Sequence, residues 1–234
     1  MKIELKEKPK KGAIIIEGFS GFGLVSTIAT EYLIDHLGAR LIGKIESEKV
    51  QPIVAIHKGQ IIEPLGIFYD SKNNIVIIRA ISNINGLEWE LTQSIVALAE
   101  EIKAKEIIST EGISSDNKPP EPEAFYFTKD DNRRKIFERM NVREMSEGII
   151  MGVTASLLTK MPETTFIFSE ANSSMPDSRA AAKIIEIIDS YLGLKVDYKP
   201  LLKKAEIFEK QIKEVLFRSK NVTNIKEKRE TYFG

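Results

Sequence analysis

The sequence predicts an α/β protein with a mostly parallel central sheet, and two observations carry this prediction. Strand-like and helix-like patterns alternate through the first 195 of the 234 residues, as is typical of a parallel sheet covered by helices. Hydrophobic residues make up 42% of the chain, and counting glycine in place of tyrosine gives about 45%, an ordinary value for a globular protein. The chain is therefore expected to bury a sizeable core.

The first predicted unit is a strand, a turn and a helix. The apolar run Ala13–Ile16 favours a strand, and it leads into the glycine-rich turn Gly18–Gly23. Helical spacing of apolar residues follows from Leu24 to Leu37, and Gly38 marks the helix end.

A meander of short strands and a second strand-helix-strand unit come next. Apolar runs bounded by Gly, Pro or Asn-Asn predict strands at 40–45, 53–56, 66–69 and 75–79. Apolar positions at helical spacing predict a helix over Leu87–Lys103, which precedes a buried strand at Glu106–Thr110. The meander is expected to lie beside a parallel core.

A proline-rich loop, Gly112–Glu123, interrupts the regular pattern, because three prolines in four positions continue neither a helix nor a strand. The elements predicted beyond it are a strand at 124–127, a helix from about Asn132, a helix at 152–159, a strand at 165–168 and a helix from Pro176-Asp177 to Leu192.

The last predicted element is a long C-terminal helix at about 198–220. Its apolar stripe consists of Leu201, Ala205, Phe208, Ile212, Val215 and Leu216. One face of this helix must be buried. Residues 1–220 are therefore interpreted as a single domain, and the polar stretch 221–234 as a mobile tail that ends in two aromatic residues.

Charge and cysteine content exclude several function classes. The 34 basic and 34 acidic side chains balance, so the chain lacks the Lys/Arg excess that nucleic acid binding requires. No apolar run reaches the roughly 18 residues of a membrane span, and no signal peptide is evident. The absence of cysteine removes disulfides and thiolate metal sites, which favours a cytoplasmic location.

The glycine turn is the first candidate ligand site, because such a turn aims backbone N–H groups at an anion. It does not match the phosphate loop, since Leu24 and Val25 stand where Lys and Ser/Thr would be. The alternative is that the glycines only permit a tight turn and close helix-strand packing. A small-molecule or nucleotide pocket at the strand ends stays open, and its candidate residues are Gly18, Ser20, Gly21, Gly23, Gly112, Ser114 and Ser115.

No catalytic constellation is recognisable. The two histidines, His36 and His57, form neither a triad nor a metal pair. Glu88 and Glu90 fit a solvated helix start better than a catalytic carboxylate pair. We therefore expect no catalytic residue, no metal and no cofactor.

Five segments in order resemble the proteasome assembly chaperone 2 family, whose archaeal members are also catalogued as ATP-grasp-like proteins. These segments are 17–26 with 31–34, 51–54 with 57–59, 148–158, 175–182 and 201–216. The resemblance covers most of the chain. It implies a three-layer α/β/α domain, a homo-oligomer, and non-catalytic action as a chaperone for proteasome α-subunits of the 20S core particle.

The resemblance also directs attention to the C-terminal residues Tyr232, Phe233 and Gly234. Proteasome-binding factors often end in a hydrophobic residue, a tyrosine and any residue, which insert between adjacent α-subunits. This chain fits the pattern if Phe233 replaces the usual tyrosine. The lost phenol hydroxyl would weaken a buried hydrogen bond by about 0.5–1.5 kcal/mol without preventing docking.

Overall fold

The computed structural model describes residues 1–19, 21–57, 60–114, 121–172 and 175–202. The predicted helix at 198–220 is described only over residues 199–202, which are helical, and the tail at 221–234 lies outside the described residues. No helix in these described ranges is both long and apolar enough to cross a membrane.

A nine-stranded sheet forms the centre of the molecule, in the order β1-β3-β6-β7-β2-β8-β11-β9-β10. Its strands are β1 (Lys2–Leu5), β2 (Ile14–Gly18), β3 (Arg40–Glu46), β6 (Leu65–Asp70), β7 (Ile75–Ala80), β8 (Glu106–Ser114), β9 (Ala124–Phe127), β10 (Arg143–Glu144) and β11 (Thr165–Ala171). A separate two-stranded sheet pairs β4 (Ala55–His57) with β5 (Gln60–Ile62).

The sheet is mixed rather than mostly parallel. Its four central strands, β7, β2, β8 and β11, run parallel, as alternating strands and helices predict. The pairs β1–β3, β3–β6, β6–β7 and β11–β9 are antiparallel. Three of the four predicted meander strands, β3, β6 and β7, join the sheet itself, so half of its strand pairings are antiparallel. The strand predicted at 53–56 instead corresponds to β4 of the separate two-stranded sheet.

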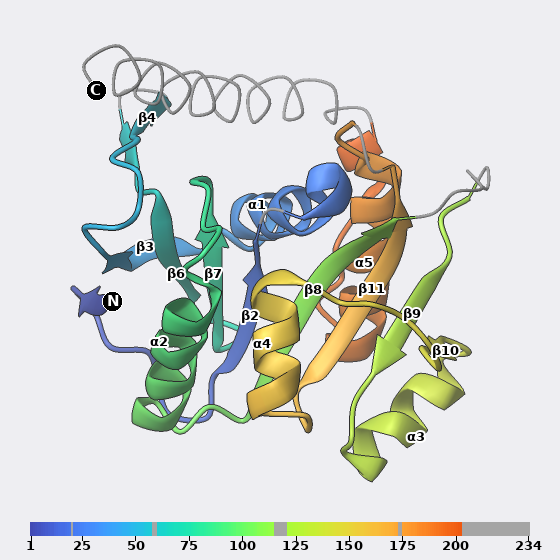
Figure 1. Cartoon of the computed structure of the whole chain (residues 1–234). Coiled ribbons are helices and arrows are strands. Elements are labelled where there is room, and N and C mark those ends of the chain that lie inside the picture. Colours follow the sequence, from blue (N-terminus) through green and yellow to red (C-terminus); the bar gives the residue numbers. More distant parts are fainter. Residues whose placement is uncertain (20, 58–59, 115–120, 173–174, 203–234) are drawn as a thin grey trace, which may run out of the picture.

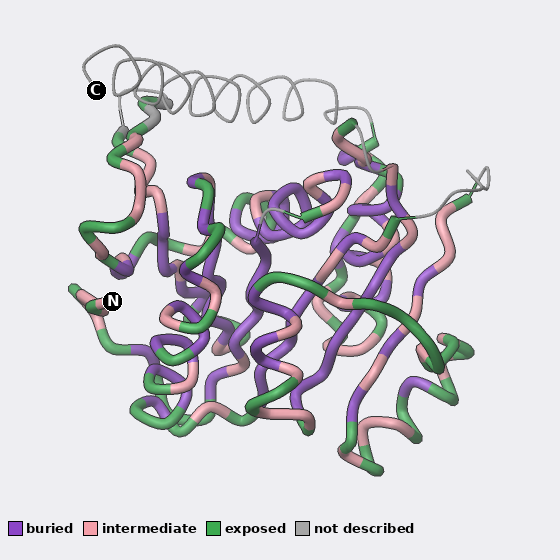
Figure 2. The backbone as a smooth tube through the Cα atoms, in the orientation of Figure 1, coloured by how far each residue is buried: buried purple, intermediate pink, exposed green. Residues whose placement is uncertain are grey.

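Helices cover both faces of this sheet and give three layers (Figure 1). The helices are α1 (Val25–Leu37), α2 (Glu88–Glu101), α3 (Asp131–Arg139), α4 (Gly152–Lys160) and α5 (Ser178–Leu192). Helices α1 and α5 pack together on one face, and α2 and α4 pack together on the other. The central strands are buried along most of their length (Figure 2).

Helix α3 closes the β9–β10 edge of the sheet through a stack of aromatic rings. The Phe137 ring lies between Tyr126 of β9 and Tyr191 of α5, with ring centroids 4.7 and 4.8 Å away. Asp130 caps this helix by accepting hydrogen bonds from the backbone N–H groups of Asn132 and Arg133.

Several strands differ from the sequence prediction, and the short strands β5 and β10 were not predicted. Strand β8 continues to Ser114, into the stretch assigned to the proline-rich loop, because it pairs with β11 over seven residues up to Ser114 and Ala171. Strand β1 was not predicted, because Lys2 and Glu4 make half of its four residues charged. It is an edge strand whose Ile3 and Leu5 pack on the core.

Candidate functional site

The glycine turn lies at the carboxyl ends of the central parallel strands, where ligands of open α/β sheets bind. Strand β2 ends at Gly18, and a short 3₁₀ turn over Phe22–Leu24 leads into α1. A Cβ atom at Gly18 would lie 2.6 Å from the Ser26 carbonyl oxygen and 2.6 Å from Thr30 Cγ2. Gly18 therefore permits a close approach of strand and helix, which is the packing role proposed above.

The predicted glycines do come together, but the space beside them is occupied. A Cβ at Gly21 would lie 1.7 Å from Glu111 Oε1, and one at Gly112 would lie 2.3 Å from the Phe22 carbonyl oxygen. Gly23 has a φ of +62° and its carbonyl accepts a hydrogen bond of 2.8 Å from the Asp177 backbone N–H. The turn is thus packed against β8 and the start of α5.

Of the three serines predicted to line this site, only Ser114 can be placed. It lies exposed at the end of β8, and Ser20 and Ser115 lie outside the described residues. The site is therefore defined by its glycines and by two carboxyl groups that the sequence analysis did not single out.

These two carboxyl groups belong to Glu17 on β2 and Glu111 on β8. Glu17 is fully buried and lies directly opposite Ser109 in the strand register. Glu111 lies two residues beyond Ser109, hence on the same face, and its Oε2 accepts a 3.0 Å hydrogen bond from Thr154 Oγ1 of α4. Ser109 Oγ donates to Thr154 Oγ1 at 3.3 Å, so the hydroxyl groups connect β8 to α4.

Burial raises the pKa of both carboxyl groups. The pKa of Glu17 rises to about 8, mainly through loss of water and further through the charge of Glu111, while Ser109 opposes the shift. Burial raises the pKa of Glu111 to about 7, against the hydrogen bonds from Thr154 and the Gly112 backbone. Neither Glu17 oxygen has a hydrogen bond of normal geometry to a described residue. The pair therefore retains protons near neutral pH.

This arrangement suits proton binding and does not suit a phosphate. An anion over Gly21 would meet the Glu111 carboxyl group instead of a free backbone N–H. A sequence signal for the pair exists, because Glu-Gly occurs at the carboxyl end of both β2 and β8, as Glu17-Gly18 and Glu111-Gly112. The repeated Glu-Gly dipeptide predicts a carboxyl pair only once β2 and β8 are known to be neighbouring strands.

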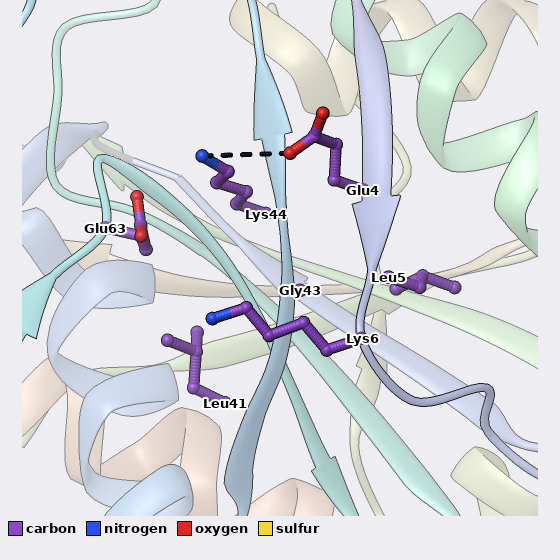
Figure 3. A pocket seen from close by; sticks show the side chains of 7 residues that line it. All are labelled: Glu4, Leu5, Lys6, Leu41, Gly43, Lys44 and Glu63. Carbon is purple, nitrogen blue, oxygen red and sulfur yellow. Dashed lines mark ion pairs between the residues drawn. The ribbon is translucent and has the colours of Figure 1, made fainter.

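A cavity of about 300 Å³ lies away from this turn, over the edge strand β1 and its neighbour β3 (Figure 3). Figure 3 shows Lys44 facing Glu4, with 3.8 Å between Nζ and Oε2. Two lysines and two glutamates balance one another in its lining, which consists of Glu4, Leu5, Lys6, Leu41, Gly43, Lys44 and Glu63. This balance favours no particular charged ligand.

A larger cavity of about 720 Å³ lies between α5 and the strands β9 and β10. Its two basic side chains are ion-paired, Arg143 with Glu123 at 2.5 Å and Lys183 with Glu186 at 3.0 Å. Glu121 and Glu170 also line it and make the lining net acidic. A phosphorylated ligand would be repelled there.

The comparisons with known proteins decide the family. Residues 15–216 match the model of the PAC2 family, a span that includes the glycine turn, α4 and the apolar stripe of the C-terminal segment. The chain belongs to the PAC2 family. A protein of Methanocaldococcus jannaschii, described as uncharacterized, is 27% identical to this chain over 212 residues, which are 86% of this chain and 84% of that protein.

Solved structures place this PAC2 chain near archaeal proteasome factors. PbaA of Pyrococcus furiosus, described as an archaeal homolog of proteasome-assembly chaperone, is 28% identical with a TM-score of 0.83. The match covers 95% of this chain and all of that one. PbaB of Pyrococcus furiosus, described as an archaeal proteasome activator, shares the fold at 22% identity and a TM-score of 0.75, over 92% of this chain and 98% of that one.

Proposed function

We propose that this PAC2 protein is a non-catalytic proteasome assembly chaperone that binds proteasome α-subunits through Tyr232, Phe233 and Gly234. The observation that carries the proposal is the match to PbaA over nearly the whole chain, combined with an aromatic C-terminal sequence. In this reading the folded domain is a carrier for the C-terminal segment, and it acts in the cytoplasm as a homo-oligomer.

The energetics of such a segment favour several copies acting together. Each aromatic ring can bury about 150–250 Å², at roughly 25 cal/mol per Å². Ordering each residue costs about 1–2 kcal/mol, and association costs about 4–15 kcal/mol more. One segment alone therefore binds weakly, whereas an oligomer that presents several gains about 10²–10⁴ in affinity through effective concentration.

Deleting Tyr232–Gly234 is expected to abolish the complex with α-subunits and to leave the fold and oligomeric state unchanged. The three residues lie outside the family match at 15–216, so the PAC2 domain does not need them. The measurement is native mass spectrometry of the full-length and truncated chains, each mixed with archaeal proteasome α-subunits. Equal binding by both chains would refute the C-terminal mechanism.

Substitution of Phe233 separates the aromatic ring from the hydroxyl group. Phe233→Tyr restores the hydroxyl group typical of proteasome-binding ends, and we expect it to bind about 2- to 10-fold more tightly, equivalent to roughly 0.5–1.5 kcal/mol. Phe233→Ala removes the ring and should bind no better than the truncated chain. Titration with α-subunits checks both, and identical affinities for all three side chains would contradict the proposal.

A further inference from the structure

An exposed apolar hairpin stands apart from the main sheet. Strands β4 and β5 pair only with each other among the described strands, with Ile56 directly opposite Ile61. Side chains directly opposite in a strand pair lie on the same face, and these two are 75% and 63% exposed. Val54, just before β4, is 57% exposed. We call Val54, Ile56 and Ile61 the hairpin face.

Such a hairpin needs a partner surface. An isolated two-stranded hairpin is marginally stable in water at best, and becomes stable when it packs against a helix or further strands. Three branched apolar side chains gathered on one hairpin are also unlike the singly scattered apolar residues of an ordinary surface.

A matching surface exists in the sequence that follows the described chain. The apolar stripe of the predicted C-terminal helix begins at Leu201, which is fully buried, and continues through Ala205, Phe208, Ile212 and Val215–Leu216. A helix with one apolar face packs that face against another apolar surface. Both surfaces are uncharged and apolar, so they are complementary in chemistry.

The end of the described chain lies within reach of the hairpin. The Tyr32 hydroxyl of α1 donates a hydrogen bond to the Asp197 carbonyl, and α1 packs on β2, β7 and β6. The hairpin connects β3 to β6 in the chain, and it projects at the same end of the sheet as the last described segment of the chain, coloured red-orange in Figure 1. Strand β6 is four positions from β11, about 19 Å at 4.8 Å per strand. A helix over residues 203–216 would span about 21 Å.

We propose that residues 203–216 pack their apolar stripe on the hairpin face of the same chain. Connection through the same chain gives the segment a high effective concentration at this surface. The inference does not depend on proteasome binding, because the packing would be observed with the isolated protein.

Disulfide trapping tests this packing directly, because the natural chain has no cysteine. The test variant carries Ile56→Cys with Ile212→Cys. The matched control carries Ile56→Cys with Lys210→Cys, which falls on the opposite side of the predicted helix. Under mild oxidation we expect an intrachain disulfide to form at least tenfold faster in the test variant, read by intact mass and by migration as a monomer on a non-reducing gel. Equal rates, or covalent dimers as the main product, would overturn the intrachain packing.

Limited trypsin digestion gives a second readout that needs no engineered bond. Cleavage sites within the segment include Lys203, Lys204, Lys210 and Lys213. Replacing the two opposed isoleucines by Ile56→Ser and Ile61→Ser should speed cleavage at these sites at least tenfold. Ile149→Ser, at an apolar side chain 92% exposed in another part of the fold, is the control and should leave the rate unchanged. Unchanged cleavage in the hairpin variant would count against the proposal.

Discussion

Replacing Glu17 by glutamine is expected to stabilise the protein at alkaline pH and to change little at pH 5. The folded-state pKa of Glu17 is raised from 4.5 to about 8 by burial. Between these values the folded state holds a proton that the unfolded state has released, so the free energy of unfolding falls as pH rises through this window. Above pH 8 the buried charge exerts its full penalty.

The size of the effect follows from the shift. Each unit of pKa corresponds to about 1.4 kcal/mol, and coupling to Glu111 spreads the change over the pair. Glu17→Gln keeps the shape and removes the charge, so we expect at least about 2 kcal/mol of added stability at pH 9, relative to the difference at pH 5. Urea unfolding at pH 5, 7 and 9 measures it.

Glu4 provides the control with the opposite sign. This carboxyl group is on the surface, and its hydrogen bond to Lys2 lowers its pKa, so its ionised form is the favoured one. Glu4→Gln should therefore give no gain in stability at pH 9.

The Glu17 prediction would be contradicted if the free energy of unfolding changed with pH in the same way for wild type and Glu17→Gln. That result would show that the buried carboxyl group does not titrate between pH 5 and 9.

Gly18→Ala is expected to cost about 3 kcal/mol of stability, which is among the largest effects of a single methyl group. The new Cβ would lie 2.6 Å from the Ser26 carbonyl oxygen, a backbone atom of α1 that cannot rotate away. It would also lie 2.6 Å from Thr30 Cγ2. Relief requires α1 to move away from β2, which disturbs packing on the core. Thermal and urea unfolding measure the loss.

Two further variants test whether the close approach of strand and helix is the cause. Gly148→Ala is the control, since its nearest neighbour is the flexible Met145 side chain at 3.2 Å, and we expect a change within about 0.5 kcal/mol. Thr30→Ser removes the Cγ2 methyl group that the new Cβ would contact, and it keeps the hydroxyl group that donates a hydrogen bond to the Ser26 carbonyl oxygen. Added to Gly18→Ala, it should recover part of the loss. A wild-type-like stability for Gly18→Ala would contradict the packing role.

The apolar runs of the central strands could be predicted from sequence because these strands are buried on both faces. Ile14–Ile16 and Ile75–Ile78 are short, continuous apolar runs, which are typical of strands covered on both faces of a sheet. Strand β1 escaped notice because Lys2 and Glu4 dominate its composition, although Ile3 and Leu5 alternate with them as an edge strand requires. Whether two strands pair in parallel or antiparallel could not be predicted either, because side chains alternate with the same period of two residues in both kinds of strand.

The candidate site was only half predictable for a related reason. A cluster of glycines predicts a tight turn because glycine adopts backbone conformations that other residues avoid. The turn Gly18–Gly23 could therefore be found from the local sequence alone. Glu17 and Glu111 lie 94 positions apart in the chain, and their proximity depends on the register that places Glu17 opposite Ser109. No local pattern encodes that register.

The place of β2 at the centre of the sheet has a consequence for how the chain acquires its structure during synthesis. Residues 14–18 leave the ribosome early, yet both neighbours of β2 come much later, since Ile14 pairs with Ile75 and Glu106. The apolar run Ile14–Ile16 has no strand partner until β7 has emerged, after about a third of the chain, and it gains its second partner, β8, only after about half. Three lysines close before it, Lys8, Lys10 and Lys11, supply the flanking charge that opposes premature association of such a strand.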